Sequence, residues 1–122
     1  MPKKILVVED DPDARELLRS ILTLAGLNVV LARDGEEGLE RAREVSPDLV
    51  ITDISMPRLD GLGLIRRLRE VPGLVNIPIL AITSYGMEKA MDAIRTGANR
   101  ALARPVQNHL VLVFVFDLLS RA

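Results

Sequence analysis

Short runs of apolar, β-branched residues recur along the chain and alternate with segments whose apolar residues are spaced as on a helix. The run at residues 5–8 is apolar at every position, which is typical of a strand buried on both faces of a parallel sheet. The run at residues 49–53 is similar but ends in a carboxylate, Asp53. The pattern predicts strands at residues 5–8, 28–32, 49–53, 77–83 and 100–103.

The segments between these strands carry helix start and stop signals. Asp11, Asp34 and Asp60 each stand where an N-cap is expected, and Gly26 and Gly97 stand where helices commonly end. We predict helices after each of the first four strands. The second helix has few apolar positions, so we expect it to be the least buried of them.

The strand-helix order repeats five times with short connections, across one domain that spans residues 1–122. Right-handed crossovers then give an open parallel sheet with helices on both faces. In such sheets ligands bind beyond the carboxyl ends of the strands. The chemically active residues at these ends are Glu9, Asp10, Asp53, Thr83 and Arg104.

Composition narrows the range of partners. The 122 residues are 48% hydrophobic, with a formal net charge of −1 and no cysteine. Such a charge balance argues against direct binding to nucleic acid or to an anionic membrane. The first apolar run is too short for a signal peptide or a membrane span, so a cytoplasmic location is expected.

Three carboxylates near one sheet edge point to a metal site. Magnesium prefers oxygen ligands and often takes one or two carboxylates together with phosphate oxygens. With Glu9 and Asp10 beside it, Asp53 is a candidate carboxylate nucleophile for a phosphoryl group. Thr83 supplies a hydroxyl and Arg104 a fixed positive charge for the transferred oxygens.

In these features the sequence resembles the receiver domain of two-component response regulators. The matching features are the acidic run Glu9-Asp10-Asp11, Asp53 followed by Met56-Pro57 and Asp60-Gly61, Thr83, Gly97-Ala98, and a basic residue before Pro105. The resemblance covers essentially the whole chain. It implies a flavodoxin-like (βα)5 doubly wound parallel sheet of strand order 2-1-3-4-5, with a cis peptide between Arg104 and Pro105.

The resemblance also implies a function. Asp53 would accept a phosphoryl group from a histidine kinase or a phosphotransfer protein. Magnesium would be held by Glu9, Asp10, Asp53 and the backbone carbonyl of Ser55. The domain would be a signalling phosphoacceptor, limited to self-catalysed phosphotransfer and autodephosphorylation, and not an enzyme acting on a separate substrate.

Two positions depart from the family pattern. Arg104 stands where lysine is usual, and the two side chains are not interchangeable. Arg104 either clamps a phosphoryl oxygen or pairs with Asp53 and occupies the site. Ala101 replaces the usual aromatic residue, for which Tyr85 is a conceivable substitute. These departures motivate an alternative hypothesis, a degenerate receiver that acts as a phosphorylation-independent interaction or dimerisation module.

Two enzymatic hypotheses fit less well. A phosphatase with an aspartate nucleophile usually has a second acid two residues later, and that residue is Ser55. A flavin or dinucleotide carrier needs a phosphate-binding loop after the first strand, where this chain has an acidic run.

The last element, residues 107–120, contains seven consecutive apolar residues from Leu110 to Phe116. A helix buries only one stripe, so a helix here would expose apolar surface, and strand propensity competes with helix in this run. We predict that this element, with the fourth helix and the fifth strand, forms a surface for a homodimer or a downstream effector.

Overall fold

The computed structural model describes residues 2–121 and contains one parallel sheet of five strands in the order β2-β1-β3-β4-β5. The strands are β1 (Lys4–Val8), β2 (Asn28–Ala32), β3 (Leu49–Asp53), β4 (Ile79–Thr83) and β5 (Arg100–Ala103). The helices are α1 (Pro12–Leu24), α2 (Gly35–Val45), α3 (Gly61–Glu70), α4 (Gly86–Thr96) and α5 (Asn108–Arg121). The predicted fold class and strand order are confirmed.

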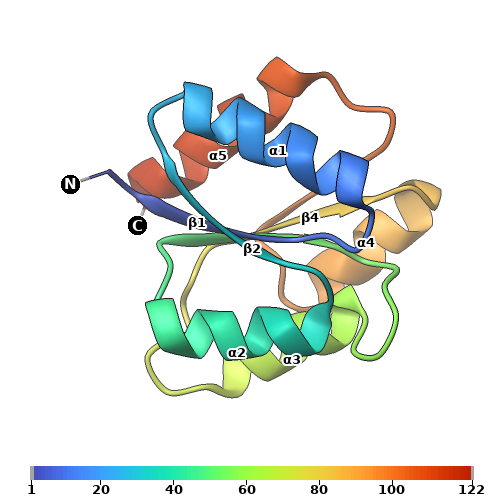
Figure 1. The fold of residues 1–122 in the computed structure, drawn as a ribbon. Helices are drawn as coiled ribbons and strands as arrows, with labels where there is room; N and C mark the ends of the chain where they lie inside the picture. The colour runs from blue at the N-terminus through green and yellow to red at the C-terminus, as the bar shows by residue number, and fades with distance from the viewer. Residues whose placement is uncertain (1, 122) are drawn as a thin grey trace.

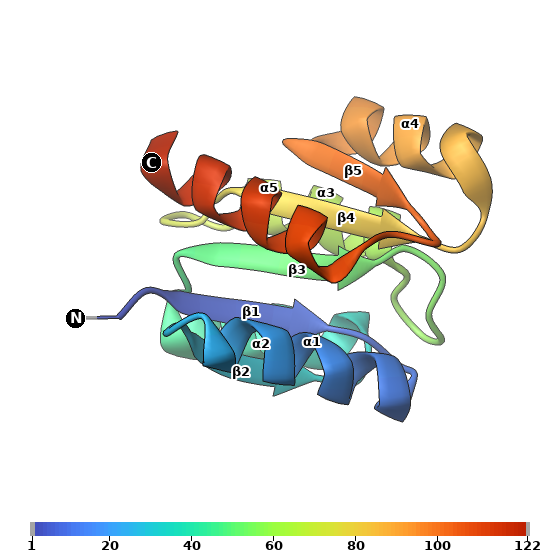
Figure 2. The same ribbon diagram turned by 90° about the horizontal axis from the view of Figure 1, so that it is seen from above.

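The helices form a layer on each face of the sheet. α1 and α5 cover one face, and α2, α3 and α4 cover the other (Figure 1). Alternate residues of a strand point to opposite faces, so Ile5 and Val7 join the core beneath α1 and α5, whereas Leu6 and Val8 join the core on the other side. Seen from above, β3 lies at the centre of the sheet (Figure 2). Asp53 is therefore the last residue of a strand that has a neighbouring strand on each side, β1 and β4.

Side chains cap the first three helices as predicted. Asp11 accepts a hydrogen bond from the Ala14 amide, and Asp60 accepts one from the Gly63 amide. Asp34 accepts one from the Glu37 amide. These caps satisfy helix N–H groups that have no partner within the helix. They also set where each helix begins, close to the strand end that precedes it.

Two predictions about the elements are wrong. β4 begins at Ile79, not at residue 77, because Pro78 has no N–H to donate to the ladder; its carbonyl still accepts from the Val50 amide at 3.0 Å. Nor is α2 the least buried helix. It buries four residues, two of them glycines that allow close packing, whereas α4 buries only Ala90 and Ala93.

The apolar run near the C-terminus is helical. Its buried residues Val111, Val115 and Leu118 recur every three to four positions, so the helical spacing places one stripe against the sheet. The prediction that some apolar surface would remain outside is confirmed: Val113 is 55% exposed and Phe116 45% exposed. Within residues 2–121, no helix combines the length and the apolar character needed to cross a membrane.

Candidate functional site

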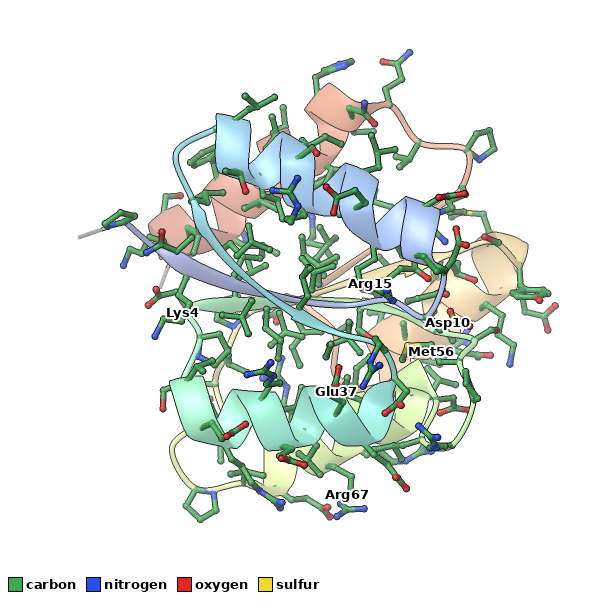
Figure 3. All side chains as sticks on the ribbon, in the orientation of Figure 1. Lys4, Asp10, Arg15, Glu37, Met56 and Arg67 are labelled. Carbon is green, nitrogen blue, oxygen red and sulfur yellow. The ribbon has the colours of Figure 1, made fainter. Side chains whose placement is uncertain are left out.

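An acidic cluster lies at the carboxyl end of the central strands. Glu9 and Asp10 follow β1, and Asp53 is the last residue of β3. One carboxylate oxygen from each of these three residues lies within 4.8 Å of the others. Asp10 is at the same end of the molecule as Met56, opposite Lys4 (Figure 3). The topology thus brings together the three acids that the sequence suggested.

Glu9 is almost fully buried, with 2% of its surface exposed. Its Oε2 accepts a hydrogen bond from the Asp11 amide at 3.2 Å, and its Oε1 accepts one from the Arg104 guanidinium at 2.7 Å. The pKa of Glu9 is raised to about 7, mainly by burial and also by the charge on Asp53, while the hydrogen bonds from Arg104 and the Asp11 amide oppose the rise. The Glu9 carboxyl therefore ionises less readily than that of an exposed glutamate.

Asp53 is held at the mouth of the site. Its Oδ1 accepts a hydrogen bond from the Ile54 amide at 2.7 Å, and its side chain is 10% exposed. Burial raises the pKa of Asp53, while the Ile54 amide and the positive charge of Arg104 oppose the rise. The carboxylate is fixed in direction but still reachable from solvent.

Arg104 reaches into the acidic cluster from the end of β5. Its Nη2 lies 2.7 Å from Glu9 Oε1, whereas its Nη1 lies 3.9 Å from Asp53 Oδ1 and donates to Ser84 Oγ at 3.3 Å. The peptide between Arg104 and Pro105 is cis, as predicted. Of the two expected roles, pairing inside the site is the one seen, but the short contact is with Glu9 and not with Asp53.

Thr83 lies at the end of β4 and is fully buried. Its Oγ1 accepts a hydrogen bond from the Tyr85 amide at 3.0 Å, which connects the hydroxyl to the residue just before α4. The Tyr85 residue is 66% exposed, and Ala101 packs against the core beneath α4. Thr83 is thus placed between the acidic site and the start of α4.

Comparison with known proteins connects this site to a family. The family model of the response regulator receiver domain matches residues 5–115. The chain belongs to the response regulator receiver domain family. An uncharacterized 14.6 kDa protein of Leptolyngbya boryana is 42% identical over 103 residues, which cover 84% of this chain and 79% of that protein.

Relatives of known type agree with this assignment. The polar-differentiation response regulator DivK of Brucella anthropi is 34% identical over 107 residues, 87% of each chain. The receiver domain of a histidine kinase from Syntrophus aciditrophicus has a TM-score of 0.91 and 31% identity, covering 98% of this chain and 92% of that one. Receiver domains belong to two-component systems, where they interact with histidine kinases and effectors as signalling proteins and not as classical enzymes.

The donor set of this receiver fits a hard divalent cation. All three clustered side chains offer carboxylate oxygens, which are the ligands that magnesium takes in proteins. The cluster also carries more negative than positive charge, since Arg104 supplies one cation for three acids. A bound cation would reduce the repulsion that remains.

Two ion pairs between residues far apart in the sequence were not predicted from it. The first joins Glu9 to Arg104, which are 95 positions apart. The second joins Asp34, predicted only as a cap, to Arg58 in the loop that follows Asp53. Neither pair has a local sequence signal, because charged residues outside helices show no periodicity that would identify a partner.

Proposed function

We propose that this receiver accepts a phosphoryl group on Asp53, with Mg²⁺ as cofactor, and thereby switches a protein-interaction face. The observation that carries the proposal is the convergence of three carboxylates beside a buried threonine hydroxyl and an arginine. The phosphoryl donor would be a phosphohistidine on a histidine kinase or on a phosphotransfer protein. Residues 1–122 would act as one receiver domain in the cytoplasm.

In this proposal Glu9, Asp10, Asp53 and the backbone carbonyl of Ser55 hold the metal. The bound cation supplies positive charge that lets a phosphoryl group approach the carboxylates and that balances the charge of its oxygens. The acidic cluster cannot receive an anion without such compensation, because like charges at close range repel strongly.

The chain's own residues perform the transfer. An oxygen of Asp53 attacks phosphorus while the bond between phosphorus and the donor's imidazole nitrogen breaks, and the electron pair of that bond stays on the nitrogen. The Thr83 hydroxyl donates to a transferred oxygen. Arg104 leaves Glu9 and turns its guanidinium to another such oxygen, where a charge-assisted hydrogen bond is strong.

An exposed apolar stripe on α4 is the first candidate for the output face. It consists of Tyr85, just before the helix, and of Met87, Met91 and Ile94 within it; each is at least 39% exposed. The last three follow a spacing of four and then three residues, so they share one side of the helix. We propose that an effector or a second copy binds around α4, β5 and α5, with Val113 and Phe116 of α5 contributing.

Incubation with acetyl phosphate and Mg²⁺, followed by intact-mass measurement, tests the phosphoacceptor role. We expect a phosphoryl adduct on the wild-type protein and none on Asp53→Asn. The same incubation with EDTA in place of Mg²⁺ should give no adduct.

The Glu9–Arg104 ion pair supports one rival hypothesis, because it already neutralises part of the acidic site. In a degenerate receiver the pair would stay closed and the domain would act as a constitutive interaction module. No adduct with acetyl phosphate or with a phosphorylated histidine kinase would favour this rival over the proposal.

A further inference from the structure

The loop between β3 and α3 contains one residue in an unfavourable backbone conformation. Arg58, five positions after Asp53, has a φ of 65°. This left-handed conformation is unfavourable for residues other than glycine. Asparagine and aspartate adopt it more easily, because their short side chains can hydrogen-bond to the nearby backbone. Some contact outside the loop must therefore favour it.

The side chain of Arg58 supplies such a contact. Its Nη1 lies 2.6 Å from Oδ2 of Asp34, a residue that is 6% exposed. The other oxygen of Asp34 accepts the Glu37 amide at 2.9 Å and caps α2. Asp34 is thus fixed by the start of α2, and it fixes Arg58 in turn.

Backbone packing brings the same two segments together. A Cβ atom built on Gly35 would lie only 2.0 Å from the carbonyl oxygen of Leu59, so the loop rests directly on the first residue of α2. Farther along, the Gly61 amide donates to the Ile54 carbonyl at 2.7 Å and closes the loop at its base. The Asp34–Arg58 ion pair adds a side-chain contact to the backbone packing between this loop, which includes Ser55, and the start of α2.

We propose that the Asp34–Arg58 ion pair is a clamp that positions the Ser55 carbonyl and so sets the Mg²⁺ affinity from outside the acidic cluster. Both residues are positioning residues, since neither belongs to the carboxylate cluster. The inference rests on the proposed function, because it takes the Ser55 carbonyl as a metal ligand. Figure 3 shows Glu37, at the start of α2, and Met56, in the loop, at the same end of the molecule as Asp10.

Mg²⁺ titration by calorimetry, with four variants, tests the clamp. Arg58→Gly removes the guanidinium but accepts the positive φ more readily than arginine does, so its folding stability should not fall. Asp34→Asn keeps an oxygen for the cap and removes the charge. Arg33→Gln is the matched control, because Arg33 pairs with Glu37 on the exposed side of α2 and lies outside the loop.

We expect Arg58→Gly and Asp34→Asn to weaken Mg²⁺ binding by about two- to fivefold, the range of a partly exposed ion pair. Arg33→Gln should bind as the wild type does, and Arg58→Lys should recover part of the loss. The difference between Arg58→Gly and wild type should shrink at about 0.5 M salt, where charge interactions are screened. Amide exchange in residues 55–59 should be faster in Arg58→Gly.

The titration distinguishes failure of the proposed function from failure of the clamp alone. A wild-type protein that binds no Mg²⁺ overturns both the proposed function and the clamp. A wild-type protein that binds Mg²⁺ with the same affinity as Arg58→Gly and Asp34→Asn overturns the clamp alone. Equal weakening in Arg33→Gln also overturns it, because loss of a positive charge should by itself strengthen Mg²⁺ binding, and the weakening would then not be specific to the Asp34–Arg58 pair.

Discussion

Glu9 is buried in the native protein but meets water when the chain unfolds. The pKa of Glu9 is raised by burial to about 7, from 4.5 for the unperturbed side chain. Between these values the native state binds more protons than the unfolded state does. The contribution of Glu9 to the free energy of unfolding is therefore fully present below about pH 4.5 and is lost as the pH rises toward 7. The groups that face Glu9 are Arg104, Asp53, Asp10 and the Asp11 amide.

In the absence of divalent cations, we expect the free energy of unfolding to fall by on the order of 1–3 kcal/mol between about pH 5 and pH 8. Glu9→Gln should remove most of this fall, since glutamine does not ionise. Asp53, whose pKa burial also raises, should leave a smaller slope of the same sign. Urea denaturation at a series of pH values measures the effect, and parallel profiles for wild type and Glu9→Gln would contradict it.

In the proposed site, the Glu9–Arg104 ion pair would compete with Mg²⁺ for the same carboxylate. We expect Arg104→Met to bind Mg²⁺ more tightly than wild type, on the order of tenfold, because a unit positive charge leaves the immediate vicinity of the metal. The titration should be made at about pH 8, where Glu9 of the wild-type protein, with a pKa of about 7, is mostly ionised.

Arg100→Met is the matched control for this titration. It removes the same charge from the first residue of β5, at a site where the guanidinium stacks over the Phe114 ring, 4.4 Å from the centroid. We expect little change in Mg²⁺ affinity there. Equal or weaker binding by Arg104→Met would show that the ion pair does not oppose the metal.

At the scale of elements, Arg69 joins segments at the end of the sheet opposite the acidic site. From the end of α3 its guanidinium donates to the carbonyls of Val75 and Ile77, to that of Gly97, and to the side chain of Asn99. The same Asn99 oxygen accepts the Ile79 amide at 2.8 Å. One side chain therefore holds the approach to β4 and the turn from α4 to β5.

We expect Arg69→Met to lower the free energy of unfolding by about 2–4 kcal/mol, because several partly buried oxygens lose a charged donor. Arg69→Lys should recover part of the loss but not all, since an ammonium cannot reach the same set of acceptors. Urea denaturation measures both. Arg67→Met, which removes a charge from an exposed position of the same helix, is the control; a similar loss there would refute the role of Arg69.

At the scale of the whole molecule, α4 is held more firmly at its C-terminal end than at its first turn. Its C-terminal end contacts Arg69 through Gly97, whereas its first turn has no side-chain cap and begins at Gly86, with a φ of 82°. The Tyr85 amide before that turn bonds to the Thr83 hydroxyl, which lies at the end of β4 beside the acidic site. In the proposed switch, a phosphoryl group on Asp53 would act on the start of α4 through Thr83.

Acetyl phosphate with Mg²⁺ should speed amide exchange at Tyr85 and Met87 several-fold, because Thr83 turns from the Tyr85 amide toward the phosphoryl group. Exchange at the C-terminal end of α4 should change little. Hydrogen exchange read by mass spectrometry or NMR measures the effect, and Asp53→Asn should abolish it. Unchanged exchange on a protein that carries the adduct would rule out this route to α4.

Much of this receiver follows from local patterns. Continuous apolar runs give strands buried on both faces, and Asp11, Asp34 and Asp60 mark where helices begin, because each carries an oxygen suited to a free helix N–H. The order of strands and helices then places the strand ends, and hence Glu9, Asp10 and Asp53, at one edge of the sheet. Hydrophobic periodicity did not predict the burial of α2, because two glycines of this helix allow close packing without large apolar side chains.

The partners of the charged side chains were decided only by the tertiary structure. The sequence by itself determined the fold class and the set of acids at the site, because these depend on backbone hydrogen bonding and on regular burial. The strand order was expected from the family resemblance and not from these patterns. The sequence did not determine that Arg104 pairs with Glu9, that Arg58 pairs with Asp34, or that Arg69 holds the far end of α4. Long flexible side chains can reach many groups, and which one they meet depends on loops whose positions are set only when the whole sheet has formed.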